Sequence, residues 1–215
     1  IYLNNMDKKN YFTTPIWAEE KPDFIKSLNK ASDKYIKDSK KKHRKLFKTT
    51  NDYGQLHYSG SLANDNNFLD FRNYIGARSW EFLDDHGYDM DQYQTILSHM
   101  WVQEFSQNGG GHQSTQVSPN QHVSGFYFLK CSDKTSFPIF HEPRTGAKAT
   151  KLKMKTKLNG PVSGTGLLHF KPVPGTLIIF PSYLEYEFAI DAAIEPFRFI
   201  QWNIQSVPKE IAKDA

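Results

Sequence analysis

Three histidines in the second half of the chain could hold a metal ion. His112 follows three consecutive glycines, His122 opens the run HVSGFYFL, and His141 ends the run FPIFH. Neutral imidazole is a good ligand for Fe(II) and for other transition metals. His122 and His141 could face one metal if their strands are neighbours. The alternative is that all three are structural histidines that bond to loop backbone.

Arg198, in FRFIQWN, is the second group that could do chemistry. A guanidinium can form a bidentate salt bridge with a carboxylate. A buried arginine without a partner is costly, so an inward-facing Arg198 needs an anion, an acidic neighbour such as Glu185 or Glu187, or Tyr186 as an acceptor. Core packing is the competing interpretation.

The only cysteine, Cys131, excludes an intrachain disulfide. It ends the apolar run FYFLKC and has no local Cys-His signature. We therefore expect a small buried or strand-end residue and not a nucleophile.

Helices are expected before residue 100 and strands after it. Apolar side chains repeat with helical spacing over 22–42 and again over 66–86, and 89–99 is expected to add a third short helical piece. Before them, 12–17 (FTTPIW) fits a short leading strand.

From Trp101 onward, seven runs have the period of strands, with Gly, Pro and Asn between them: WVQEF, HVSGFYFL, FPIFHEP, GLLHFKPV, GTLIIF, YEFAI and RFIQWNIQ. This order predicts a single α+β domain over 1–215, with helices buttressing one face of a β-sandwich or barrel. Residues 1–100 would supply the strand and helices, and 101–208 the β core. The Lys- and Gly-rich stretch 145–166 would be a flexible insertion between two strands.

Two of these segments, 109–129 and 173–188, together with FRFIQWN resemble the 2-oxoglutarate/Fe(II)-dependent oxygenases, especially the prolyl-hydroxylase-like members of marine cyanophages. The resemblance covers 100–206 well and 12–17 weakly. It implies a double-stranded β-helix of the jelly-roll or cupin-like kind, with two or three N-terminal helices packed on one face. It also implies that Glu142-Pro143-Arg144, which stands for the family's Asp-Pro-Arg, is a strand-ending turn near the pocket mouth.

The family's iron ligands are replaced in this chain. Relatives have H-x-H or H-x-D in the first segment and F-P-S-x-L-x-H in the second, where this chain has Gln116, Ser118 and Tyr186. A glutamine carbonyl is a weak neutral ligand, a serine hydroxyl does not ionise near neutral pH, and a phenol has a pKa near 10. Gln113 and Gln201 also stand where relatives tend to have His or an acid. We therefore expect no catalytic residue, no metal at these positions and no cofactor.

The resemblance implies roles for two further residues. Arg198 lies twelve residues after Tyr186, which matches the family's interval between the distal histidine and the arginine that pairs with 2-oxoglutarate. Tyr127 is similar to the tyrosine that helps to hold this co-substrate. In the family the arginine points into the barrel, so Arg198, together with Tyr127, would bind 2-oxoglutarate or another anion. Core packing is the alternative for each.

Charge is unevenly distributed over the 215 residues. The segments 40–48 and 144–157 each hold six Lys or Arg and no acid, and the rest of the chain has 15 basic against 23 acidic residues. Two basic segments on an acidic body could bind nucleic acid or another polyanion, an acidic protein or a lipid surface. Solvated surface is the alternative, because neither segment interleaves aromatics with its charges.

No apolar run approaches the length of a membrane span and no signal peptide opens the sequence. We expect a soluble protein of the host cytoplasm or of a phage particle. The favoured function is a non-catalytic binding or structural module, such as a phage virion or assembly protein, with protein partners or homo-oligomer contacts. One alternative is an active hydroxylase that uses Fe(II), 2-oxoglutarate and ascorbate with unorthodox ligands. The other is a polyanion-binding protein.

Overall fold

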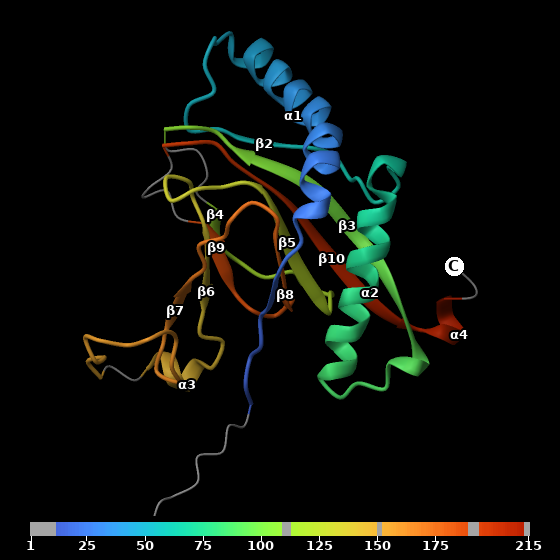
Figure 1. Cartoon of the computed structure of the whole chain (residues 1–215), viewed down its shortest axis with the longest axis vertical. Coiled ribbons are helices and arrows are strands. Elements are labelled where there is room, and N and C mark those ends of the chain that lie inside the picture. The colour runs from blue at the N-terminus through green and yellow to red at the C-terminus, as the bar shows by residue number, and fades with distance from the viewer. Residues whose placement is uncertain (1–11, 109–112, 150–151, 189–193, 213–215) are drawn as a thin grey trace, which may run out of the picture.

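Two antiparallel sheets face each other at the centre of the structure (Figure 1). The computed structural model describes residues 12–108, 113–149, 152–188 and 194–212. The larger sheet has the order β1 (Trp17–Glu20), β8 (Thr176–Pro181), β5 (Val123–Lys130), β10 (Phe197–Pro208), β3 (Tyr93–Phe105) and β2 (Leu56–Tyr58). The smaller sheet has the order β4 (Gln113–Gln116), β9 (Tyr186–Phe188), β6 (Pro138–His141) and β7 (Leu167–His169).

Two long helices cover the outer face of the larger sheet (Figure 1). They are α1 (Ile25–Phe47), which follows a 3-10 turn at Pro22–Phe24, and α2 (Leu69–Asp85), which follows a 3-10 turn at Asn66–Phe68. A third 3-10 turn (Met90–Gln92) and two short helices, α3 (Thr145–Lys148) and α4 (Lys209–Ala212), complete the described elements. None of these helices is long and apolar enough to span a membrane.

The strands of the larger sheet carry two separate cores because successive side chains point to opposite faces. In β5, Tyr127 and Leu129 pack under the helices, whereas Phe126 and Phe128 pack between the sheets. The core between the sheets is almost entirely aromatic and includes Phe105, Phe126, Phe128, Phe140, Phe180, Tyr186, Phe188, Phe197 and Phe199. This arrangement of two facing antiparallel sheets with helices on one side is the expected α+β fold.

Gly125 lets the largest side chain of the outer core approach β5. A Cβ at this position would lie 2.2 Å from the ring of Trp202 and 2.7 Å from the carbonyl oxygen of Ile178. Trp202 in turn packs edge-on against Phe71 of α2, with 5.7 Å between the ring centroids. The glycine of the SGFYF run is therefore explained by packing.

Several element boundaries differ from the sequence prediction. Residues 93–99 form the first part of β3 and not a helix, because the end of β10 pairs with them and satisfies their backbone groups. The leading strand begins at Trp17, the last residue of the range expected for it. The strands β2 and β4 were not expected, since three or four residues give too short a pattern to detect.

Candidate functional site

The three positions at which the resemblance implies iron ligands, Gln116, Ser118 and Tyr186, lie close together. Gln116 and Tyr186 lie directly opposite each other on the neighbouring strands β4 and β9. Ser118 follows two residues after Gln116, and its side chain is in hydrogen-bond contact with the hydroxyl of Tyr186. The structure thus brings together the three residues that the sequence singled out.

Tyr186 fills the centre of this site. Its side chain is 1% exposed, and its ring packs against the rings of Phe126 and Phe180, with centroids 5.1 and 5.6 Å away. Burial raises the pKa of this phenol to about 12, although hydrogen bonds from Gln201 and Ser118 oppose the rise. The hydroxyl therefore stays protonated at neutral pH.

A chain of amide hydrogen bonds holds the Tyr186 hydroxyl from the larger sheet. Nε2 of Gln103 donates to Oε1 of Gln201 over 2.7 Å, and Nε2 of Gln201 donates to the oxygen of Tyr186 over 2.6 Å. Gln103 and Gln201 are 2% and 3% exposed. The three side chains form a buried, uncharged network that crosses from β3 through β10 to β9.

A second polar network joins β5 and β10 to the turn after β8 and to the loop that carries Ser118. The hydroxyl of Ser124 donates to Oδ1 of Asn203 over 2.8 Å, so it accepts from the hydroxyl of Ser182, which is also 2.8 Å away. The backbone N–H of Ser118 donates to the carbonyl of Ser182, and that of Ser182 donates to the carbonyl of His122. These bonds tie the turn after β8 to the loop that carries Ser118.

The residues at the three positions do not fit an Fe(II) site. Such sites use two imidazoles and a carboxylate, whereas here the positions hold an amide, a hydroxyl and a protonated phenol whose oxygen is already hydrogen-bonded. Within the described residues, no group of three or more His, Cys, Asp or Glu side chains could hold a metal ion.

Two of the histidines considered as alternative ligands have protein partners of their own. Nδ1 of His122 accepts from the backbone N–H of Ser206 over 3.0 Å, and Nε2 of His141 is 3.6 Å from Oε1 of Glu187. His112 lies outside the described residues.

Arg198 and Tyr127 are on the opposite face of the larger sheet from the one the resemblance implied. Tyr127 packs under the helices and its hydroxyl donates to the carbonyl of Lys21 over 2.6 Å. On β10, Phe197, Phe199 and Gln201 face the space between the sheets, and Arg198 lies beneath α1. The side chains of β10 alternate regularly here, so the residue between Phe197 and Phe199 points to the outer face of the sheet.

Arg198 takes part in a buried charge network that docks α1 on the sheet. Its Nε lies 2.7 Å from Oε2 of Glu104, and its Nη1 lies 2.7 Å from Oδ1 of Asp33. Nζ of Lys40 is 2.7 Å from Oε1 of Glu104 and 3.2 Å from Oδ2 of Asp52. Burial opposes the ionisation of Glu104, but the hydrogen bond from Lys40 and the charge of Arg198 outweigh it and lower the pKa of this carboxyl. The acidic partners are thus Glu104 and Asp33 and not Glu185 or Glu187.

The other sequence expectations concern the surface. Glu142 and Arg144 form a bidentate ion pair in which both N–O distances are 2.8 Å, and this pair holds the pKa of Glu142 at about 2.

The basic segment 40–48 forms the last turns of α1 and the residue after it, and Lys40 is already paired with acids. In 144–157, a short helix is followed by irregular chain, with 150–151 outside the described part. Polyanion binding by either segment stays a prediction.

Comparisons with known proteins agree with this fold. Residues 99–193, somewhat less than half of the chain, match the family described as "Putative 2OG-Fe(II) oxygenase". AviO1 from Streptomyces viridochromogenes Tue57 superposes with a TM-score of 0.60 at 12% identity over 89% of this chain and 90% of that one. A prolyl hydroxylase from Trichoplax adhaerens, in complex with a hypoxia inducible factor peptide, gives 0.53 at 9% identity over 89% and 84%.

A third structure is matched over a shorter stretch. It is a 2OG-Fe(II) oxygenase family oxidoreductase from Burkholderia pseudomallei, with a TM-score of 0.48 at 13% identity. The match covers 70% of this chain and 66% of the other protein, so this chain spans slightly less than two thirds of that protein's length. No curated protein matches the chain.

The resemblance to the 2-oxoglutarate/Fe(II)-dependent oxygenases is confirmed, and the chain has the double-stranded β-helix of that superfamily. The expectation of no cofactor is contradicted, because the family that matches 99–193 is named for Fe(II) and 2-oxoglutarate. The replacement of ligands at Gln116, Ser118 and Tyr186 concerns one metal site and does not decide which other groups the chain binds.

Proposed function

We propose that this chain is a non-catalytic representative of the oxygenase fold that acts as a binding module. The observation that carries the proposal is Tyr186, a buried protonated phenol held by Gln201 and Ser118 where relatives have an iron ligand. The phenylalanines around it support the proposal, because they occupy the space between the sheets. Function depends on the site and not on the fold, so a retained fold does not imply retained catalysis.

A protein or a second copy of this chain is the partner we favour for such a module. Leu46 and Phe47 at the end of α1 are 74% and 64% exposed, and they lie among the lysines of 40–48. Exposed apolar side chains rimmed by polar residues are typical of protein interaction surfaces. A virion or assembly role in a phage is the specific form of this proposal.

Rebuilding the ligand set tests whether the three positions alone account for the difference from an iron site. We expect the variant Gln116→His, Ser118→Asp, Tyr186→His to bind Mn(II) more than about tenfold more tightly than the natural chain, because it places two imidazoles and a carboxylate on the neighbouring strands β4 and β9 and the loop after β4. Electron paramagnetic resonance of free Mn(II) during a titration measures the difference.

The matched control is Gln116→Leu, Ser118→Ala, Tyr186→Phe, which changes the same positions without adding ligands and should bind Mn(II) no better than the natural chain. Circular dichroism establishes that both variants fold. Equal Mn(II) affinity of the natural chain and the rebuilt variant would count against the proposal and would favour an active hydroxylase with unorthodox ligands.

A further inference from the structure

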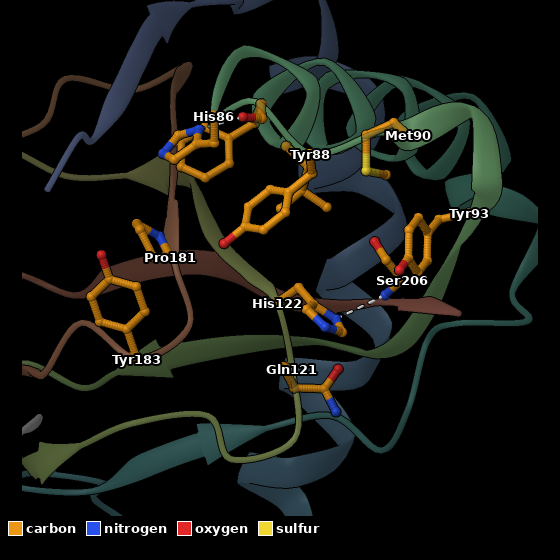
Figure 2. A pocket seen from close by; sticks show the side chains of 11 residues that line it. His86, Tyr88, Met90, Tyr93, Gln121, His122, Pro181, Tyr183 and Ser206 are labelled. Carbon is orange, nitrogen blue, oxygen red and sulfur yellow. Dashed lines mark hydrogen bonds between the residues drawn. The ribbon is translucent and has the colours of Figure 1, made fainter. Parts of the chain in front are cut away.

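A cavity of about 310 Å³ lies outside the barrel, between the end of α2 and the ends of β8 and β10 (Figure 2). Its lining includes Phe82, Leu83, His86, Tyr88, Met90 and Tyr93 on one side, and Gln121, His122, Pro181, Tyr183 and Ser206 on the other. This volume is at the lower end of the range found for small-molecule sites, so it suits a ligand of one ring system. The cavity does not include the residues of the former iron position.

The walls of the cavity are aromatic and its floor is apolar. Phe82 and Met90 are 1% and 2% exposed, whereas Tyr88 and Tyr183 are each 60% exposed. Figure 2 shows the rings of Tyr88, Tyr93 and Tyr183 standing around the cavity from three different segments. Aromatic rings gain additional energy from edge or offset contacts with another ring. A ring-shaped ligand is therefore favoured over a linear one.

Among the residues that the structure describes, no lysine, arginine, aspartate or glutamate lines the cavity. An ionised ligand would lose hydration there without gaining an opposite charge, and this is costly in an apolar environment. The cavity thus selects against carboxylates and phosphates and for neutral ligands.

Hydrogen bonds fix which nitrogen of each histidine carries the proton. Nδ1 of His122 accepts from the N–H of Ser206, so its Nε2 is the nitrogen that can donate. Nδ1 of His86 contacts the carbonyl of Phe82, which can only accept, so Nε2 of the neutral His86 ring is an acceptor. Within the described residues, this Nε2 and Oγ of Ser206 are buried and have no hydrogen-bond partner. Such atoms are few in native structures and call for a partner from outside the chain.

We propose that this cavity binds a neutral aromatic ring that carries a carbonyl acceptor, as a carboxamide does. The ring packs on the Phe82 and Met90 floor between the tyrosines. The ligand carbonyl accepts from Nε2 of His122, whose Nδ1 is held by the backbone N–H of Ser206. This site is independent of the state of the former iron position.

Benzamide is a suitable probe, and benzoate is its charged counterpart of the same shape. We follow the binding of benzamide to the full chain by ¹⁵N–¹H correlation spectra. The backbone amide resonances of Tyr88, Gln121 and Ser206 should shift, with a Kd on the order of 1 mM, because a ligand with so few atoms gains little binding energy. Benzoate should bind at least about tenfold more weakly, because nothing in the lining neutralises it.

Tyr88→Ala should weaken benzamide binding about threefold to tenfold through the loss of a ring contact. The control is Tyr58→Ala, which removes a tyrosine of similar exposure, 62%, that does not line the cavity and should leave the affinity unchanged. If Tyr88→Ala lowers the melting temperature, Tyr183→Ala serves in its place. No shifts up to about 10 mM benzamide, equal binding of benzoate, or equal effects of the two alanine variants would overturn the proposal.

Discussion

Glu104→Gln should destabilise the protein by about 3–5 kcal/mol at neutral pH, the cost of removing one partner from a buried ion pair. The side chain of Glu104 is 3% exposed and lies between Arg198 and Lys40, each 2.7 Å away. The substitution keeps the shape of the side chain and removes the charge. Arg198, 5% exposed, would then retain Asp33 as its only acidic partner. Urea denaturation gives the free energy of unfolding.

The control is Glu185→Gln, which removes a carboxylate 2.9 Å from Lys148 in a pair whose side chains are 38–39% exposed. An exposed pair contributes about 0–1 kcal/mol, so this variant should be nearly as stable as the natural chain. Equal losses in the two variants would show that the network beneath α1 has no special role.

The effect of Glu104→Gln should also depend on pH with a definite sign. The folded-state pKa of Glu104 lies below the ordinary value of 4.5. A carboxyl of this kind stabilises the folded state above its unfolded-state pKa, and that contribution is lost as the pH falls through the folded-state pKa. The difference in unfolding free energy between the natural chain and the variant should therefore shrink below pH 4.5.

Tyr186→Ala should cost about 3–5 kcal/mol of stability, as for other large aromatic side chains removed from a packed core. The ring is enclosed by phenylalanines on both sheets, and these cannot close the cavity without leaving their own contacts. Tyr186→Phe keeps the ring but leaves Nε2 of Gln201 without its acceptor, so we expect a loss of about 1–3 kcal/mol. Chemical denaturation of the two variants separates the packing contribution from the hydrogen bond. A loss below about 1 kcal/mol in Tyr186→Ala would mean that the ring does not fill the barrel.

The order of the elements could be predicted from the sequence, because hydrophobic period and turn residues are local properties. The helices around 25–47 and 69–85 and seven of the strands fall where that period places them. The start of β3 could not be found in this way, since it is a strand through its pairing with β10.

That Gln116, Ser118 and Tyr186 lie close together could be inferred from the sequence, because all three lie in segments that the resemblance covers. The resemblance implied the wrong face for Arg198. Strand alternation gives the right one, because Arg198 lies between Phe197 and Phe199, which face the space between the sheets. Glu104 and Gln103 gave no signal by themselves. Their roles depend on residues about a hundred positions away in the chain, Arg198 and Gln201. The phenylalanines that alternate in FYF (126–128) and FRF (197–199) do indicate an aromatic interior, because alternate residues of a strand share one face.

Turnover of 2-oxoglutarate by the natural chain distinguishes a non-catalytic binding module from an active oxygenase. The purified protein is incubated with Fe(II), ascorbate and 2-oxoglutarate, and succinate is measured against a reaction without protein. Because Tyr186 holds a protonated, hydrogen-bonded phenol at the position of the third ligand, we predict succinate no higher than in the protein-free reaction. Succinate that forms in proportion to the concentration of the chain would contradict the account.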